Sequence, residues 1–311
     1  MPTSGTEDRS IARLDNVSVR FGAHDALKDV TASFSPGAVG LLGPNGAGKS
    51  TMLKALLGFV TPTSGRMDVL GIDVAKDPQR VRARLGYMPE SDGHIPGMNA
   101  VSFVAYCAQL AGLPRSDAMQ RAHEVLYYVG LGEARYRNTE TYSAGMKQRI
   151  KLAQALVHDP DLLFLDEPTN GMDPKGRDEM LELVVDLATR KGVNLILSSH
   201  LLPDVEATCD RVVVMYQGAV ATQGTIADLK QRRRQVFEVR VKGDVDTFVR
   251  ALETAGAECH TGEDLLRVLV APDQGPRDLF ALAARHQVQV RHLRPSVPTL
   301  EDVFAETIGE E

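Results

Sequence analysis

Tryptophan is absent from this sequence, and aromatic residues make up only 5% of its 311 positions. Its three cysteines, Cys107, Cys209 and Cys259, lie far apart and include no C-x-x-C pair. This odd, scattered set gives no disulfide framework, so we expect a reducing compartment. Basic residues are fewer than acidic ones, with 35 lysines and arginines against 41 aspartates and glutamates. The net charge of −6 argues against a general nucleic-acid-binding surface, although it does not exclude a local basic patch.

Long hydrophobic runs are also lacking. The polar start of the chain, MPTSGTEDRS, has no apolar segment of the kind that a signal peptide requires, and we expect residues 1–10 to form a disordered leader. The uncharged stretch Ile95–Pro114 is interrupted by Pro96, Gly97 and Gly112, which makes it too broken to cross a bilayer. If the protein works at a membrane, a partner must therefore supply the spanning part.

The composition that remains, 43% hydrophobic and 24% charged, is typical of a globular protein with room for more than one domain. Short apolar runs alternate with helical patterns over residues 11–234, which predicts an α/β fold with a doubly wound, mostly parallel sheet, a β-rich N-terminal part and a helical subdomain at about 95–150. The predicted strands are Ala12–Phe21, Ala26–Phe34, Ala38–Leu42, Arg66–Leu70, Tyr87–Met88, Asp161–Asp166, Val193–Ser199, Arg211–Tyr216 and Ala219–Thr222. The predicted helices are Lys49–Phe59, Asp77–Leu85, Asn99–Gly132 with a break at Gly112, one that begins at Ser143 and stops at Asp159, Pro174–Lys191, Pro203–Cys209 and Thr225–Arg234.

The pattern resets near Gln235, where we expect a domain boundary after a basic helix end, Arg232–Arg234. Beyond it, the order β-α-β-β-α-β predicts a small ferredoxin-like domain over residues 235–311. Cys259 and His260 have no companions at ligand spacing, so we expect no metal site there. The predicted elements are Val236–Val241, Asp244–Ala255, Ala257–His260, Leu265–Val270, Arg277–His286 and Gln287–His292, with a last helix at Thr299–Ile308.

The stretch Gly43–Thr51, GPNGAGKST, fits the pattern G-x-x-x-x-G-K-[ST] between a predicted strand and a predicted helix. Its glycines let backbone N–H groups turn inward around an anion, and the helix N-terminus adds a partial positive charge. Lys49 can reach the β- and γ-phosphates of a nucleotide, and the Ser50 hydroxyl can ligate Mg²⁺. A glycine-rich turn that merely starts a helix is the weaker alternative. The motif predicts a nucleoside triphosphate site without saying which nucleotide binds.

Two acids follow a second buried strand. In Leu162–Glu167, LLFLDE, an apolar run leads to Asp166 and Glu167 at the carboxyl edge of the sheet, where ligands bind in open α/β folds. Asp166 is placed to hold Mg²⁺ through water, and Glu167 to orient or deprotonate a water that attacks the γ-phosphate. Two solvated acids at a strand end are the alternative, which is less plausible for a pair in a chain that already has a phosphate loop.

Two further features point toward a γ-phosphate. The stretch Tyr142–Arg149, YSAGMKQR, places Ser143 and Gly145 at a helix start, which predicts a second anion site. Since one γ-phosphate needs one cradle, the second would serve the nucleotide of another molecule; standing alone, the motif would be a simple serine cap. His200 ends the next buried strand and could contact the γ-phosphate, although a lone histidine is more often structural.

In this order the motifs resemble the nucleotide-binding subunit of an ABC (ATP-binding cassette) transporter, over about residues 12–234. The strings Tyr-Met-Pro-Glu and Gly-Met-Lys-Gln-Arg are similar to those of bacterial drug, lipid and polysaccharide exporters, and the tail Thr299–Thr307 resembles the small domain that such cassettes often carry. The matching features are the aromatic Phe21, the Walker A motif Gly43–Thr51, the Q-loop around Glu90, the signature Ser143–Gln148, the Walker B motif Leu162–Asp166 with Glu167, the D-loop Gly171–Asp173 and the switch His200.

The resemblance implies ATP as the nucleotide and Mg²⁺ as its metal. The expected catalytic residues are Glu167, His200 and Lys49, and the expected metal ligands are Ser50, Glu90 and Asp166. The expected nucleotide-binding residues are Phe21, which would stack on adenine, then Gly43, Pro44, Asn45, Gly46, Ala47, Gly48, Lys49, Ser50 and Thr51 around the phosphates, and Ser143, Ala144 and Gly145, which would close on ATP bound by the opposite protomer.

Four residues depart from the family pattern. Glu90 stands where the Q-loop normally has glutamine; a carboxylate can still approach Mg²⁺, but it adds negative charge. Ala144 replaces a glycine, which is tolerable if φ there is negative, and Met146 replaces a glutamine. Phe21 replaces the commoner tyrosine and keeps its stacking face.

The resemblance implies a head-to-tail dimer of two copies of this chain with two ATP molecules between them. Closure and reopening of the dimer would drive integral membrane permease subunits, which would dock on the helical region Asn99–Gly132 and the Glu90 loop. The protein would then be peripheral, on the cytoplasmic side of the inner membrane, with no nucleic-acid partner. We expect the C-terminal domain to support dimerisation or to regulate the ATPase.

The main alternative is a soluble ABC-type ATPase that does mechanical work on ribosomes or chromosomes. The translation-factor branch carries two cassettes in one chain, and this chain has one. The DNA-repair branch interrupts its cassette with a long coiled coil, but no such heptad run lies between Gly43 and Asp166. A phosphate-loop kinase or GTPase would leave Ser143–Gln148 unexplained, so the transporter interpretation is favoured.

Overall fold

The computed structural model describes residues 10–231, 235–261, 265–271, 274–296, 300 and 304. Nearly all of the expected leader, the basic run Arg232–Arg234 and most of the last predicted helix, Thr299–Ile308, lie outside the described residues. The chain divides into two compact units, Met1–Gly224 and Thr225–Glu311. This division falls before the predicted boundary near Gln235, because α8 (Ile226–Gln231) groups with the second unit.

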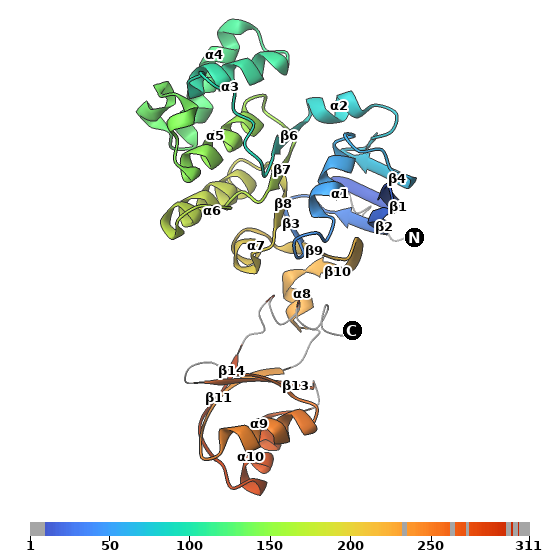
Figure 1. Cartoon of the computed structure of the whole chain (residues 1–311), viewed down its shortest axis with the longest axis vertical. Coiled ribbons are helices and arrows are strands. Elements are labelled where there is room, and N and C mark those ends of the chain that lie inside the picture. Colours follow the sequence, from blue (N-terminus) through green and yellow to red (C-terminus); the bar gives the residue numbers. More distant parts are fainter. Residues whose placement is uncertain are drawn as a thin grey trace, which may run out of the picture. The chain divides into compact units, whose positions relative to one another are not determined.

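A six-stranded sheet forms the centre of the first unit (Figure 1). Its strands β9, β3, β8, β7 and β6 run parallel, which confirms the predicted mostly parallel sheet. β7 is buried along its whole length, which explains its unbroken apolar run. In spatial order the strands are β10 (Ala219–Thr225), β9 (Arg211–Tyr216), β3 (Ala38–Leu42), β8 (Asn194–Ser199), β7 (Leu162–Asp166) and β6 (Leu85–Met88).

The N-terminal strands form a second, antiparallel sheet, which is the predicted β-rich part. Its inward side chains, such as Leu14, Val17 and Phe34, are buried in one core with Leu41 and Phe164 of the central sheet. One short strand was not predicted, because two residues are too few to show alternation. The order is β2 (His24–Phe34), β1 (Ala12–Phe21), β4 (Ser64–Val69) and the unpredicted β5 (Ile72–Asp73).

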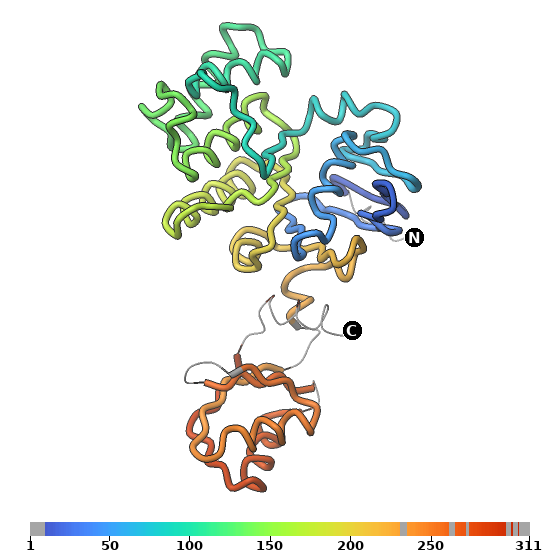
Figure 2. Tube along the Cα trace, viewed as in Figure 1, coloured from blue at the N-terminus to red at the C-terminus, as the bar shows by residue number. Residues whose placement is uncertain are grey.

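Helices pack beside and around the central sheet, and Figures 1 and 2 show the helical part that contains α3, α4 and α5. Gly112, with a left-handed φ of 99°, separates α3 from α4 as predicted. The first helix ends earlier than predicted because Gly58 takes a left-handed φ of 71°. Within the described residues, no helix is both long and apolar enough to cross a membrane. The helices are α1 (Lys49–Leu56), α2 (Pro78–Ala83), α3 (Ala100–Leu110), α4 (Arg115–Tyr128), α5 (Ala144–Leu156), α6 (Pro174–Thr189) and α7 (Leu202–Thr208), with short 3-10 turns at Gly132–Tyr136 and Thr139–Thr141.

In the second unit, the described residues that follow α8 form a four-stranded antiparallel sheet with two helices on one face (Figure 1). Phe248, Leu252 and Leu279 of these helices are buried against Phe237 and Val268 of the sheet. The element order β-α-β-β-α-β and the strand order confirm the predicted ferredoxin-like arrangement. The strands lie in the order β12 (Glu258–Thr261), β13 (Leu266–Val270), β11 (Gln235–Lys242) and β14 (Gln289–Ser296), and the helices are α9 (Val245–Thr254) and α10 (Pro276–Arg285).

Candidate nucleotide-binding site

The phosphate loop joins β3 to α1, and its backbone requires glycine. Gly46 and Gly48 have left-handed φ angles of 82° and 102°. A Cβ atom at Gly48 would lie 2.7 Å from the carbonyl oxygen of Ala26, whereas one at Gly46 would meet nothing within 4 Å. The loop is therefore packed tightly against β2 at Gly48 and is open at Gly46. Such an open backbone can bind phosphate groups.

A cavity of about 420 Å³ lies beside this loop. That volume is in the range of small-molecule sites. Two of its residues, His24 and Ala26, were not predicted. His24 pairs with Phe21 across the β1–β2 ladder, so the hairpin register could have revealed it, but nothing in the sequence singles out Ala26. The lining residues are Phe21, His24, Ala26, Pro44, Asn45, Gly46, Ala47, Gly48, Lys49, Ser50, Thr51, Glu90 and Glu167.

Lys49 lies at the centre of the loop, with a side chain only 7% exposed. Its ammonium donates hydrogen bonds to the carbonyl oxygens of Gly43, at 2.6 Å, and of Pro44, at 3.3 Å. Nζ is 3.7 Å from Oε1 of Glu167. Burial lowers the pKa of Lys49, and the nearby carboxylates of Glu167 and Asp166 oppose that shift. A buried positive charge thus stands beside the cavity where phosphates would bind.

Glu167 links this lysine to the predicted switch histidine. Its Oε2 lies within hydrogen-bond distance of Nδ1 of His200, at 2.8 Å. Its backbone has a left-handed φ of 52°, an uncommon conformation for a residue other than glycine, and its N–H donates to the carbonyl oxygen of Ser198. Burial raises the pKa of Glu167, while His200 and Lys49 act in the opposite direction. A raised pKa is the property that a general base in a buried site requires.

Asp166 ends β7 and is buried, with 1% of its surface exposed. Oδ2 accepts a long hydrogen bond of 3.4 Å from the hydroxyl of Tyr87, and Oδ1 has no hydrogen-bond partner among the described residues. A buried carboxylate oxygen without a protein partner is suited to contact a bound cation or water. Mg²⁺ takes one or two carboxylates and keeps several waters, so Asp166 and the Ser50 hydroxyl form a suitable donor set. No larger cluster of His, Cys, Asp or Glu that could hold a metal occurs in the part of the chain that the structure describes.

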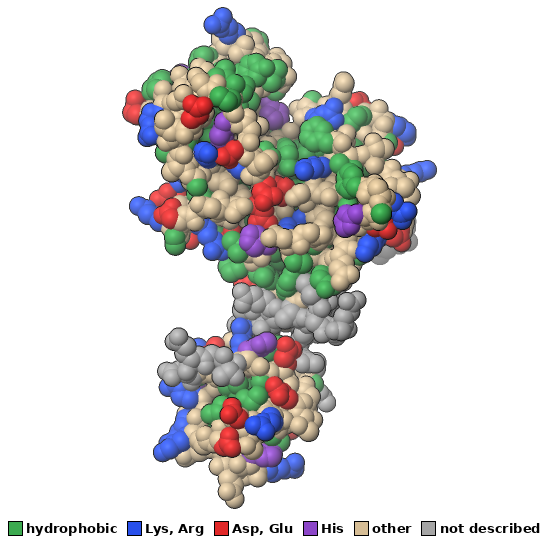
Figure 3. Space-filling view, viewed as in Figure 1, with side chains coloured by type: hydrophobic (Ala, Val, Ile, Leu, Met, Phe, Trp, Pro, Cys, Tyr) green, Lys and Arg blue, Asp and Glu red, His purple; other side chains and the backbone are tan. Residues whose placement is uncertain are grey.

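Glu90 and Phe21 line the cavity from different elements. Glu90 follows β6, and its side chain is exposed. On the face drawn in Figure 3, acidic side chains gather near the middle of the first unit. Phe21 ends β1 and is 53% exposed, which leaves a ring face available for stacking. The phosphate loop, Glu90 and Glu167 thus line one cavity, and Asp166 at the end of β7 is near enough to Lys49 to affect its pKa.

The signature residues lie elsewhere, because Ser143, Ala144 and Gly145 do not line this cavity. Ser143 caps α5, and its hydroxyl accepts a hydrogen bond from the N–H of Met146 at 3.4 Å. Ala144 is the first residue of α5 and has no left-handed φ, so alanine is tolerated in place of glycine. The amide of Gln148 donates to the carbonyl oxygen of Asn170 at 2.8 Å, which joins the signature helix to the segment before the D-loop.

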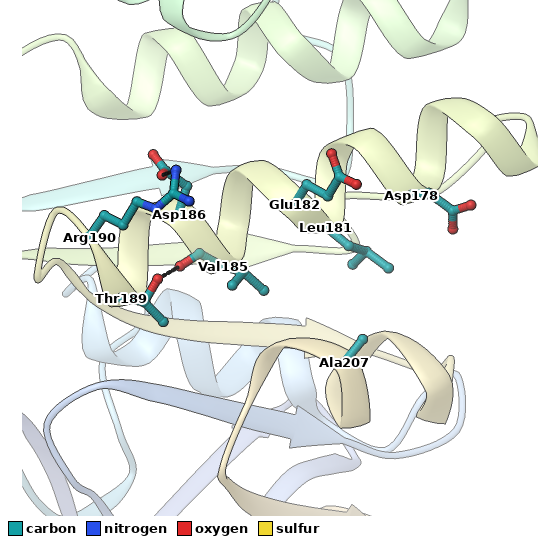
Figure 4. A pocket seen from close by; sticks show the side chains of 8 residues that line it. All are labelled: Asp178, Leu181, Glu182, Val185, Asp186, Thr189, Arg190 and Ala207. Carbon is teal, nitrogen blue, oxygen red and sulfur yellow. Dashed lines mark hydrogen bonds and ion pairs between the residues drawn. The ribbon is translucent and has the colours of Figure 1, made fainter.

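A second cavity, of about 540 Å³, lies between α6 and α7 (Figure 4). Three acidic residues of α6, Asp178, Glu182 and Asp186, line it together with apolar side chains and Arg190. Arg190 forms an ion pair with Asp186 at 3.2 Å. Although this cavity is larger, it has neither a glycine-rich loop nor a lysine, and its acidic rim would repel phosphate. The nucleotide site is therefore the cavity at the phosphate loop.

Two family models match the chain. The model described as "ABC transporter" matches residues 27–170, and that described as "ATP-binding protein DrrA1-3-like, C-terminal domain" matches residues 224–308. Among solved structures, one described as the ATP-binding subunit of an ABC transporter is 29% identical, covers 72% of this chain and 93% of its own, and superimposes with a TM-score of 0.64. A dimeric ATP-binding cassette bound to ADP and Pi is 23% identical with a TM-score of 0.64, covering 69% of this chain and 98% of its own, and shows the fold alone.

Curated relatives match almost end to end. The uncharacterized ABC transporter ATP-binding protein YxlF of Bacillus subtilis is 33% identical over 95% of this chain and 98% of its own length. The bacitracin transport ATP-binding protein BcrA of Bacillus licheniformis is 30% identical over 96% and 98%, and the daunorubicin/doxorubicin resistance ATP-binding protein DrrA of Streptomyces peucetius is 32% identical over 87% and 83%. With these matches and the phosphate-loop site, the chain belongs to the ABC transporter family as an ATP-binding subunit, an ATPase.

Proposed function

We propose that this chain drives an exporter whose membrane-spanning permease subunits are separate proteins. The observation that carries the proposal is the buried pair Lys49 and Glu167, with His200 in contact with Glu167, beside an open phosphate cradle. Relatives named for drug resistance or antibiotic transport support export of a drug or an antibiotic. Nothing observed favours the alternative of a soluble mechanical ATPase over this function.

The residues of the cavity support a direct hydrolysis. The loop N–H groups and Lys49 bind the β- and γ-phosphates, and Phe21 stacks on the adenine. Glu167 takes a proton from a water molecule, whose oxygen attacks the γ-phosphorus as the bond to the ADP oxygen breaks. Ser50 and Asp166, with Glu90 near them, would hold Mg²⁺, which neutralises phosphate charge when it is bound. His200 orients the carboxylate of Glu167 through their hydrogen bond.

A second copy of the chain would complete the site. Ser143 and Ala144 are exposed and lie outside their own chain's cavity, and they begin a helix whose first N–H groups suit an anion. In a head-to-tail dimer, each signature would close on the ATP of the partner. A solved cassette of this fold that is described as dimeric supports this assembly.

The permease would dock on the helical part and the Glu90 loop, at the cytoplasmic face of the inner membrane. Exposed apolar side chains on α3, Tyr106 at 42% and Leu110 at 70%, support a partner surface there. The second unit has its own core, with no group of His, Cys, Asp or Glu among its described residues that could hold a metal ion, and would support dimerisation or regulate hydrolysis.

The test uses the full-length chain and its Glu167→Gln variant. Purified wild type should hydrolyse ATP, and the variant should lose activity by a factor of about 10² or more while it still binds ATP, because only the proton acceptor is removed. Tagged Glu167→Gln protein, trapped with ATP in solubilised native membranes, should retain a multi-span membrane protein in near-equal amount. Hydrolysis by the variant at the wild-type rate would show that the assigned base is wrong. Recovery of ribosomal or chromosomal proteins alone would favour the soluble alternative.

A further inference from the structure

α5 carries a buried lysine that no step of the proposed function uses. Lys151 lies between Ile150 and Leu152 in an otherwise apolar stretch, and its side chain is only 1% exposed. Its ammonium donates a hydrogen bond of 2.7 Å to the backbone carbonyl oxygen of Glu90. A cation in a core is unfavourable unless it is paired and hydrogen-bonded, so packing alone does not explain a lysine at this position.

The contacts of α5 extend along the segment that follows β6. Nζ of Lys151 lies 3.8 Å from Oδ1 of Asp92. One helical turn earlier, the ammonium of Lys147 lies 2.9 Å from Oδ2 of the same carboxylate. Two lysines on one face of α5 therefore hold this segment at Glu90 and at Asp92, and Lys151 is the buried member of the pair.

Glu90 is the point where these contacts meet the nucleotide site. Its side chain lines the cavity, while its carbonyl oxygen is bound to Lys151. A glutamate here adds a negative charge to a site that already contains Asp166 and Glu167, and that must also accept phosphates. Lys151 places a buried positive charge beside the backbone of Glu90.

We propose that Lys151 is a positioning residue for Glu90, which fixes the backbone of this loop and supplies the counter-charge for an acid beside the phosphates. The proposal rests on the proposed function of the cavity. Because Lys151 and the signature residues belong to the same helix, a shift of α5 would move Glu90 with it. Glu90, which faces the nucleotide of its own chain, and the signature residues, which would face the nucleotide of a partner chain, would then move together.

The test is a double-mutant cycle of Lys151→Met and Glu90→Gln in the full-length chain. Lys151→Met should lower kcat about tenfold and change the dissociation constant of a fluorescent ATP analogue less than about threefold, because it displaces Glu90 without removing the cradle. Lys151→Arg should restore most of the lost rate. In the Glu90→Gln background, where no extra charge needs balancing, Lys151→Met should cost no more than about threefold. Lys76→Met, at an 83% exposed lysine, is the matched control and should leave kcat unchanged.

An unchanged kcat in Lys151→Met, or an equal loss in both backgrounds, would overturn the proposal. If thermal melting shows that Lys151→Met does not fold, Lys151→Gln is measured in the same cycle, since it keeps a donor for the carbonyl and removes the charge. A loss of rate that occurs only with Glu90 present would support the counter-charge, and an equal rate or an equal loss in both backgrounds would overturn it. Failure of the proposed function would look different. The wild type would then not hydrolyse ATP, or Glu167→Gln would be fully active, whatever the Lys151 variants did.

Discussion

In the nucleotide site, the buried charges of Lys49 and Glu167 stabilise each other. Lys49 and Glu167 are each 7% exposed, and neither would be stable alone at that depth. Their separation of 3.7 Å and the contact from Glu167 to His200 give each charge a partner. The left-handed backbone of Glu167 costs on the order of 1–3 kcal/mol, which the surrounding strands must outweigh. Strain at this residue agrees with a role in catalysis rather than in packing.

The rate of ATP hydrolysis should report the pKa of Glu167. Burial raises this pKa above the ordinary value of 4.5, and only the ionised carboxylate can accept a proton. We expect kcat to fall as the pH is lowered, with a midpoint above 4.5. In His200→Ala, loss of the hydrogen bond that lowers the pKa should move this midpoint to higher pH.

The measurement is a pH profile of kcat at saturating ATP, over the range in which circular dichroism shows an unchanged fold. His292→Ala, at an exposed histidine of the second unit, is the control and should keep the wild-type midpoint. A midpoint at or below 4.5, or one that is the same in His200→Ala, would contradict the role given to this pair.

At the scale of secondary-structure elements, capping side chains stabilise the first turns of helices. Asn99 caps α3, and its Oδ1 accepts a hydrogen bond of 2.9 Å from the N–H of Ser102. Asn99→Ala should therefore destabilise the first turn by about 1 kcal/mol. Hydrogen exchange followed by mass spectrometry should show roughly fivefold faster exchange in peptides that cover this turn. Asn99→Ser retains a capping oxygen and should stay close to wild type; equal exchange in all three proteins would show that the cap is not limiting.

Element types were predictable where one local rule dominated. The phosphate-loop strand Ala38–Leu42 was placed correctly because an apolar run and a glycine loop agree. Ser143 marked a helix start through its capping side chain, whereas at Asn99 the helical pattern alone indicated the start and the structure added the cap. The sequence could not show which residues form hydrogen bonds with residues far away along the chain. The bond from Lys151 to the Glu90 carbonyl, and that from Thr169 to the buried Asp204, exist only once α5, β6 and α7 have packed.

At the scale of the whole molecule, the two units have separate cores. Because each buries its own apolar side chains, we expect the fragment Met1–Gly224 to fold and to bind the fluorescent ATP analogue within about threefold of the full chain. ATP-dependent dimerisation of Glu167→Gln, measured by sedimentation, should be weaker in the fragment. If dimerisation and ATPase rate are the same with and without Thr225–Glu311, the second unit has neither proposed role.

The contact between His200 and Glu167, the assigned general base, has a kinetic consequence. Glu167 is 7% exposed, whereas His200, joined to it at 2.8 Å, is 39% exposed. Since His200 is not among the residues that line the nucleotide cavity, we expect a proton passed from Glu167 to its imidazole to reach water outside that cavity. The acid can return to its charged form while product still fills the cavity. We therefore expect deprotonation of Glu167 and release of ADP to be independent events.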